Sequence, residues 1–319
     1  MIYNFTSNFS NDMYRFLELK ESLNFSPNSY DWGLNSIDTY AKTYFPNETE
    51  LTKAFVESWI KNCRSNITQN GQRGRVTIIR DFSRYLKLKG HDSYVIDASL
   101  VPKSQSYIPH LFTDNELKQF FRAADTLPAK KNKSNIIAPV LFRMMYCCAM
   151  RPNEPLALLR NDVDLINGII IIKNSKRHTD RIIQLTEELV TYLKEYDESV
   201  GNREFFFSSQ SNGQLKIGWS YNIFETCWVK AGLGSRNTAP RPYDFRHSSS
   251  SRVILKWIQE DKDIMAMLPY LQTHLGHKNL KDTLYYIHLL PEHIFDSQKI
   301  DLTDFNQIYP EIKNEKTKR

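Results

Sequence analysis

The second half of the chain carries side chains that could together break and rejoin a phosphodiester. The guanidiniums of Arg151 and Arg246 could hold the non-bridging oxygens, and the ammonium of Lys176 could protonate a leaving alkoxide. The hydroxyl of Tyr286 could attack the phosphorus, and the imidazole of His277 could hydrogen-bond an oxygen of the pentacovalent state that results. This combination suits phosphodiester chemistry that needs no metal ion.

Arg151 lies at a predicted junction between two helices. Pro152 ends the preceding helix and Asn153 can cap the next, so the guanidinium stands in a tight turn. Glu154 is close enough to orient that guanidinium by hydrogen bonding. A lone arginine beside a glutamate is more often a structural ion pair, so a catalytic interpretation depends on the other motifs.

Lys176 lies between two apolar, β-branched runs, residues 168–173 and 181–185, which predict a β-hairpin. A lysine on such a turn can reach into a DNA groove and donate a proton to the departing oxygen. Lys173 and Arg177 are alternatives for this role. The other interpretation is an exposed turn lysine without a catalytic role.

Arg246 is predicted to lie in the first turn of a helix, in the stretch Tyr243-Asp244-Phe245-Arg246-His247. With an ordinary pKa of about 10, the Tyr243 phenol can donate a hydrogen bond but is a poor general base at neutral pH. Either this phenol steers the phosphate, or another group accepts the proton of the nucleophile. His247 is expected to pack beneath the site.

His277 follows Leu275-Gly276, and the glycine can end a helix and turn the imidazole toward the site. A zinc site formed by His274, His277 and His288 is the alternative. Gly276 would break the helix face that two of them share, and no cysteine or acid completes a ligand set. We therefore expect neither a metal nor another cofactor.

The order and local sequence of these motifs resemble the tyrosine recombinase (phage integrase) family over about residues 30 to 290. Arg151 and Glu154 resemble the family's first arginine box, although Met150 and Pro152 replace the usual neighbours. The stretch around Arg246 resembles the second arginine box, with Tyr243 in place of the usual histidine or lysine. The resemblance also implies that a lysine in the predicted hairpin turn is catalytic.

The resemblance implies that Tyr286 is the nucleophile, because the family's spacing from Leu-Gly-His to Tyr-x-His ends there. Tyr285 would point about 100° away around a helix, where we expect it to pack. Attack by Tyr286 would give a 3′-phosphotyrosyl link and a free 5′-hydroxyl.

Periodicity and the resemblance together predict a mainly α protein with a small antiparallel β-sheet (α+β). Residues 1–99 are expected to form a helical core-binding domain that clamps DNA, residues 100–110 a proline-containing linker, and residues 111–295 the catalytic domain. A capping box, Thr113 to Glu116, opens the catalytic domain. Residues 296–319 form a tail that either docks on a neighbouring protomer or packs on its own domain.

One predicted helix in the first domain, residues 69–89, has a basic stripe opposite its apolar face. The residues of this stripe are Arg73, Arg80, Arg84 and Lys87. By itself such a stripe is more often a solvated surface than a nucleic-acid interface. Its position in the domain that clamps DNA in the resembled family favours contacts with phosphates.

The composition agrees with a globular, DNA-associated protein of 319 residues. Lys and Arg (42) exceed Asp and Glu (36), which gives a net charge of +6 and a mild bias toward polyanions. The four cysteines have no CxxC spacing, and neither a secretory signal nor a membrane-spanning stretch is visible. These features predict a cytoplasmic protein with reduced cysteines.

The resemblance implies a site-specific recombinase, an integrase or transposase of a mobile element, that acts on double-stranded DNA as a homo-tetramer. Accessory DNA-bending proteins could assist it. Alternatives are a chromosome-dimer-resolving recombinase, a type IB topoisomerase-like enzyme, and a catalytically weak DNA-binding relative, which the substitution at Tyr243 keeps open.

Overall fold

The computed structural model describes residues 4–63, 67–129, 133–173 and 180–290, and the chain forms two compact units divided between Tyr107 and Ile108. The division lies inside the predicted linker, residues 100–110. Each unit has its own hydrophobic core. Lys176, Arg177 and the predicted tail, residues 296–319, lie outside the described residues.

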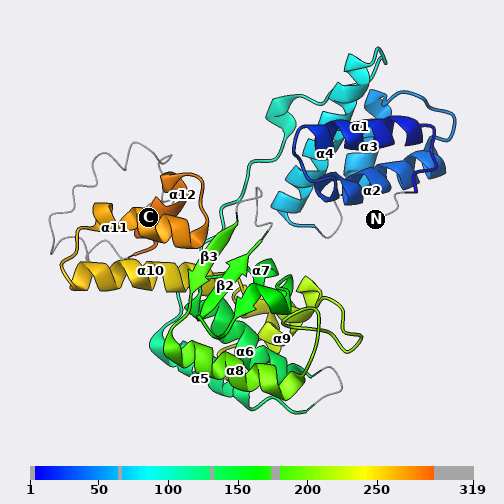
Figure 1. Ribbon diagram of the computed structural model, residues 1–319. Coiled ribbons are helices and arrows are strands. Elements are labelled where there is room, and N and C mark those ends of the chain that lie inside the picture. Colours follow the sequence, from blue (N-terminus) through cyan, green and yellow to red (C-terminus); the bar gives the residue numbers. More distant parts are fainter. Residues whose placement is uncertain (1–3, 64–66, 130–132, 174–179, 291–319) are drawn as a thin grey trace. The chain divides into compact units, whose positions relative to one another are not determined.

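The first unit is helical (Figure 1). Its α-helices are α1 (Ser10–Ser22), α2 (Asn28–Tyr44), α3 (Lys53–Asn62) and α4 (Gln69–Leu88). Their apolar faces meet in one core, in which Trp59 and Phe82 are fully buried. The side chains of Thr52 and Thr68 cap α3 and α4, so local sequence fixes where these two helices begin.

The segment that leaves the first unit is fastened to α4. Asn70 donates a hydrogen bond to the carbonyl of Gln105 and accepts one from its N–H, both at 2.8 Å. Gln69 donates to the carbonyl of Lys103 at 3.1 Å. The proline content of this stretch carries no information about these helix contacts.

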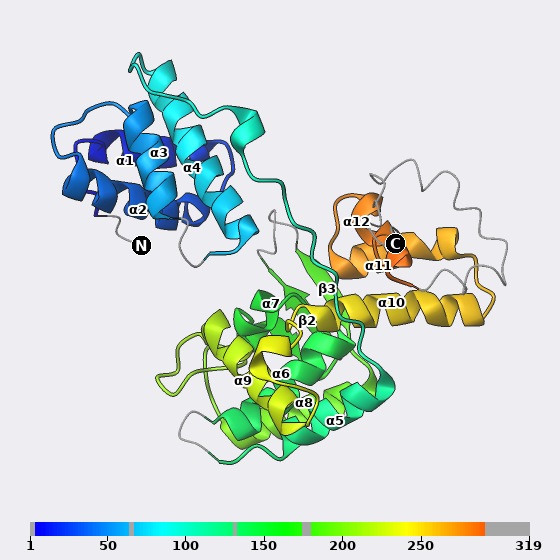
Figure 2. The same ribbon diagram turned by 180° about the vertical axis from the view of Figure 1, so that it is seen from behind.

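The second unit combines helices with a small sheet (Figures 1 and 2). Its α-helices are α5 (Asp114–Asp125), α6 (Ser134–Cys147), α7 (Asn153–Leu156), α8 (Glu187–Val200), α9 (Ile217–Lys230), α10 (Asp244–Gln259), α11 (Ile264–Leu275) and α12 (Leu280–Leu284). The strands β1 (Val163–Asp164), β2 (Ile169–Ile172) and β3 (Arg181–Gln184) are antiparallel in the order β1-β2-β3. The predicted fold class is confirmed.

Local signals predicted some boundaries of this unit better than others. The capping box of α5 is confirmed, since Thr113 and Glu116 each accept a hydrogen bond from the other's backbone N–H. The helix on which Tyr285 was expected to lie is instead the short α12, which ends before Tyr285 and is followed by a 3-10 turn at Ile287–Leu289. The α11 helix ends at Leu275, and Gly276 caps it with a φ of 64°, which suits glycine.

Two hydrophobic cores meet at α10. The larger core includes Phe245 in the first turn of α10, and the smaller one packs α10 against α11 and α12 through residues such as Ile254 and Leu268. Figures 1 and 2 show α10 extending from the group α5, α6, α8 and α9 toward α11 and α12. Arg246, one residue after Phe245, is therefore fully buried where these cores meet.

Candidate active site

A cavity of about 390 Å³ brings together side chains from distant parts of the second unit. The predicted site residues along its wall are Arg151, Tyr243, His247, His277 and Tyr286. The wall also includes Lys278 and Lys281, which the sequence analysis did not select. The start of α7, the start of α10 and the stretch after α11 position these groups.

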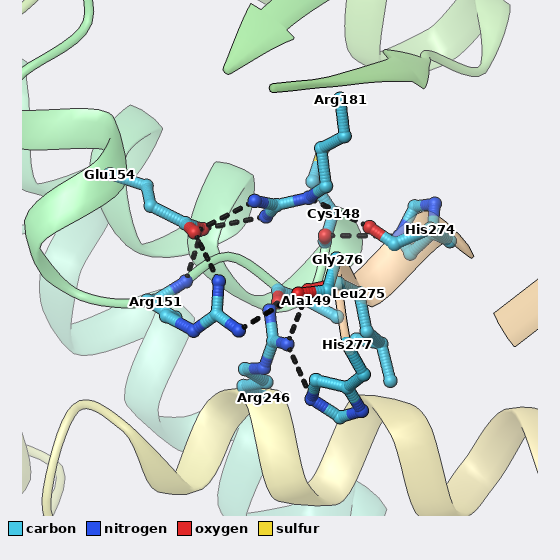
Figure 3. A network of polar contacts seen from close by, with 10 residues as sticks. All are labelled: Cys148, Ala149, Arg151, Glu154, Arg181, Arg246, His274, Leu275, Gly276 and His277. Carbon is cyan, nitrogen blue, oxygen red and sulfur yellow. Dashed lines mark hydrogen bonds and ion pairs between the residues drawn. The ribbon is translucent and has the colours of Figure 1, made fainter. Parts of the chain in front are cut away.

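Arg246 lies inside the protein and is held by neutral acceptors (Figure 3). Its Nη1 donates to the carbonyl of Ala149 and its Nη2 to the carbonyl of Leu275, both at 2.7 Å. It forms no ion pair with a carboxylate among the described residues, and its buried Nε has no hydrogen-bond partner there. Burial lowers the pKa of this guanidinium, against the opposing effect of the nearby Tyr286 phenol.

Glu154 joins two arginines (Figure 3). Its carboxylate accepts hydrogen bonds from Arg151 Nη1 at 2.8 Å and from the Arg151 backbone N–H at 2.7 Å. It also accepts a fork of two bonds from Arg181, at 2.8 and 2.7 Å. Burial alone would raise the pKa of Glu154, but Arg181, Arg246 and the Arg151 backbone N–H together outweigh burial and lower it. The carboxylate is therefore ionised at neutral pH and orients Arg151.

The Nη2 atom of Arg151 is held more loosely than its Nη1 atom. Its Nη2 lies 3.4 Å from the carbonyl of Gly276. Burial would lower the pKa of Arg151, but Glu154 and the Tyr243 phenol outweigh it and raise the pKa. The Tyr243 phenol therefore lies close to this guanidinium, on the cavity wall.

His277 is fixed as a neutral imidazole. Arg246 Nη2 lies 3.0 Å from Nε2 of His277, and because a guanidinium can only donate, Nε2 must accept. The proton is then on Nδ1, which lies 2.9 Å from the Thr283 hydroxyl. Burial and the surrounding arginines lower the pKa of His277 to about 3. In this arrangement Nε2 is an acceptor, whereas we had expected His277 to donate to phosphate.

Tyr286 lies against this cluster. Its ring stacks on that of His277, with 6.0 Å between centroids and 8° between planes. Burial raises the pKa of the phenol, and Arg246 opposes this effect. Tyr286 is only 2% exposed, whereas Tyr285 is partly exposed and also lines the cavity. Tyr285 packs partly against the smaller core, as we expect, and Tyr286 is the more deeply buried of the two and lies near Arg246.

His247 is nearer to the cavity than the sequence suggested. Its ring lies 5.0 Å from that of Tyr243 and 5.7 Å from that of Tyr286. Its buried Nδ1 has no hydrogen-bond partner among the described residues. Burial and the charges of Arg246 and Arg241 lower its pKa to about 4, so it is neutral at pH 7.

The family assignment follows from a sequence comparison. The model of the Phage integrase family matches residues 110–293, more than half of the chain. The chain belongs to this family. Its members are the tyrosine recombinases, enzymes that break and rejoin DNA, so this protein is a tyrosine-type site-specific recombinase.

Curated relatives cover most of this tyrosine recombinase. The candidate integrase/recombinase y4rE of Sinorhizobium fredii is 26% identical over 284 residues, which are 86% of this chain and 89% of y4rE. A tyrosine recombinase of Pseudothermotoga lettingae is 23% identical and covers 78% of this chain and 82% of its own. The XerA recombinase of Thermococcus kodakarensis is 24% identical, over 74% and 78% of the two chains.

Solved structures share the fold. The XerH site-specific recombinase bound to palindromic difH substrate, in a post-cleavage complex, matches with a TM-score of 0.62 and 20% identity over 85% of this chain and 78% of that one. The Tn1549 transposon integrase in complex with transposon right end DNA matches with a TM-score of 0.56 and 14% identity, over 86% and 93% of the chains.

Two side chains that support the recombinase site were not predicted from the sequence. Arg181 and Thr283 do not line the cavity but hold Glu154 and His277, which orient or contact the arginines. Arg181 had only the signal of a charged residue at the start of an apolar strand, and Thr283 had none. The Arg181–Glu154 contact joins residues 27 positions apart, whereas the His277–Thr283 contact joins residues six apart across the turn between α11 and α12.

In the first unit, the predicted basic stripe is only partly free. Arg73 donates to the carbonyl of Pro102, and Arg80 donates to the carbonyl of Ile96, both at 2.8 Å. These two arginines therefore hold the returning segment against α4. Arg84 and Lys87 are exposed on the same helix.

The alternative zinc site can be compared with the observed contacts. Nε2 of His274 donates to the carbonyl of Cys148 at 3.1 Å, and His277 is engaged with Arg246 and Thr283. Residues 4–290, outside the gaps in that range, contain no group of three His, Cys, Asp or Glu side chains that could hold a metal. Within the same residues, no helix combines the length and apolar character needed to cross a membrane.

Proposed function

We propose that this recombinase is the integrase or transposase of a mobile element and cleaves DNA through Tyr286. One observation carries the chemical part: Arg151 and the Tyr286 phenol line one cavity, and the Arg246 charge beneath it is balanced by no ion-paired carboxylate among the described residues. A phosphate at this cavity would supply the negative charge that Arg246 lacks.

The proposed reaction conserves the energy of the phosphodiester. The Tyr286 oxygen loses its phenolic proton to water, attacks phosphorus, forms a 3′-phosphotyrosyl bond and displaces the 5′ oxygen, which Lys176 protonates. Arg151 and Arg246 stabilise the added negative charge of the pentacovalent state, and removing one such preorganised donor costs about 10²- to 10³-fold in rate. A second strand's 5′-hydroxyl then reverses the step, which transfers the strand.

The choice of nucleophile is tested by trapping the covalent adduct. A binding site is first selected from random duplex DNA with the Tyr286→Phe protein, and a nicked version of that site is then offered to each variant. We expect Tyr286→Phe to bind and form no adduct, and Tyr285→Phe to form it. An adduct with Tyr286→Phe, or none with Tyr285→Phe alone, would assign the nucleophile to Tyr285.

The mobile-element role is supported by sequence similarity to y4rE, which spans more of both chains than the sequence similarity to the XerA of Thermococcus kodakarensis does. Resolution of chromosome dimers is the second candidate, because XerA relatives and the XerH structure also match. Excised circles joining the DNA ends that flank the gene, present with wild type and absent with Tyr286→Phe, would support the first role. Chromosome dimers that accumulate with Tyr286→Phe, without such circles, would support the second.

We also propose that the recombinase acts as a homo-tetramer on two DNA duplexes. A lambda integrase structure of the same fold is a tetramer bound to a Holliday junction. The mass of the complex with a synthetic four-way junction, measured by analytical ultracentrifugation, tests this. Four chains per junction are expected, and one chain per duplex that never forms a larger complex would contradict synapsis.

A further inference from the structure

Arg181 has a guanidinium whose bonds all run inward. Its Nη1 and Nη2 bind Glu154 as a fork, and its Nε donates to the carbonyl of His274 at 2.8 Å (Figure 3). Its side chain is only 3% exposed. It is absent from the cavity wall, so it reaches the reacting atoms only through its neighbours.

The partners of Arg181 belong to the elements that carry the proposed catalytic groups. Glu154 lies in the first turn of α7, three residues after Arg151. His274 lies in the last turn of α11, three residues before His277. Figure 3 shows Arg181 descending from β3 to lie between these two elements. Gly276 passes so close that a Cβ there would meet Arg181 Cδ at 3.0 Å.

The charge of Glu154 creates a conflict that Arg181 resolves. Glu154 orients Arg151, but a buried carboxylate 2.8 Å from Nη1 also cancels the positive charge that Arg151 presents to phosphate. The guanidiniums of Arg151, Arg181 and Arg246 carry three positive charges. The Glu154 carboxylate cancels one of them, so two positive charges remain. Without Arg181, only one positive charge would remain while the pentacovalent phosphorus gains a negative charge.

We propose that Arg181 is a positioning residue that neutralises Glu154, so that Arg151 is held in orientation and keeps its charge for the transition state. This inference rests on the proposed role of Arg151 in stabilising the phosphate. Arg181 would then affect the rate of cleavage and leave the affinity for DNA nearly unchanged, because its side chain is buried away from the cavity wall and its effect is largest when charge develops.

The test is a comparison of three variants: Arg181→Met, Glu154→Gln and the double variant. Each is assayed for single-turnover adduct formation on the nicked selected duplex and, separately, for affinity to the same duplex. We expect Arg181→Met to lower the rate about 10- to 100-fold, as partner residues of functional groups typically do. Adding Glu154→Gln should then restore part of the rate, because it removes the uncompensated carboxylate.

This recovery distinguishes compensation of charge from structural support. If Arg181 only supports the fold, the double variant will be as slow as Arg181→Met or slower, and that result overturns the proposal. Arg203→Met is the matched control, since the Arg203 side chain is also 3% exposed but binds Asp197 and the Phe206 carbonyl away from the cavity. It should lose stability and keep the adduct rate.

Two further results keep the test decisive. If Arg181→Met does not fold, as judged by circular dichroism, Arg181→Lys is used in its place. Lysine keeps the positive charge, so this variant should form the adduct at a rate within about tenfold of wild type. A rate more than about 100-fold below wild type would overturn the proposal. If wild type forms no adduct, the proposed function fails. If wild type and Arg181→Met form the adduct at equal rates, the proposed role of Arg181 is wrong and the proposed function stands.

Discussion

Replacing Glu154 by glutamine should destabilise the catalytic unit strongly at neutral pH. The carboxylate is 6% exposed and accepts four hydrogen bonds, two from Arg151 and two from Arg181. Glutamine has one acceptor oxygen, and its amide group would face guanidinium N–H donors. Removing one partner of a buried ion pair typically costs about 3 to 5 kcal/mol. For a unit of this size, this corresponds to a melting temperature lower by about 10 °C.

The cost should depend on pH in a definite direction. The pKa of Glu154 in the folded protein is below its ordinary value of 4.5, so its contribution to stability is fully present above pH 4.5 and is lost as the pH falls through the folded pKa. Wild type therefore approaches the glutamine variant in acid. Other carboxylates titrate in both proteins and cancel in the difference.

Differential scanning calorimetry of the full chain, at about pH 7 and at several pH values below 4.5, measures this difference. Glu195→Gln, an exposed carboxylate on α8, is the control and should change stability by less than about 0.5 kcal/mol. A difference in melting temperature below about 2 °C at neutral pH would refute the reasoning. A large difference in melting temperature that stays constant as the solution becomes acidic would also refute the reasoning.

Three other predictions concern separate parts of the mechanism. Thr283→Val removes the acceptor of the His277 Nδ1 proton, so the rate of adduct formation should fall about tenfold; an unchanged rate would mean that the tautomer of His277 does not matter. Arg84→Ala should reduce the slope of log affinity against log salt by about one, measured by fluorescence anisotropy, whereas Lys53→Ala, exposed on α3, should leave it unchanged. Lys176→Ala should slow cleavage about 10²- to 10⁴-fold. A substrate with sulfur at the bridging 5′ position should restore the rate, because a thiolate leaves without a proton. If this substrate does not restore the rate, Lys176 is not the acid.

The sequence predicted the parts of the fold that depend on local signals. Apolar periodicity and the Thr113 capping box located helices, and two β-branched runs located the hairpin. The partners of Arg246 were not predictable in the same way, because they are backbone carbonyls 97 and 29 residues away. Any residue type offers such a carbonyl, so no sequence pattern marks it.

In the candidate site too, sequence patterns predicted some features but not those that depend on packing. Spacing predicted five residues that the structure brings to one cavity: Arg151, Tyr243, His247, His277 and Tyr286. Spacing did not predict the tautomer of His277, which the contact with Arg246 sets, or the burial of Tyr286, which its packing in the smaller core produces. Short-range motifs thus identified the groups, and long-range packing determined their protonation.

The neutral surroundings of Arg246 also bear on how the enzyme behaves in ordinary laboratory solutions. Sulfate and inorganic phosphate are tetrahedral oxyanions, and either could balance this interior charge as a DNA phosphate would. Buffers that contain them would then raise the melting temperature and compete with substrate, beyond the general screening that chloride gives at equal ionic strength. The anion chosen for storage and assay therefore becomes a determinant of apparent activity.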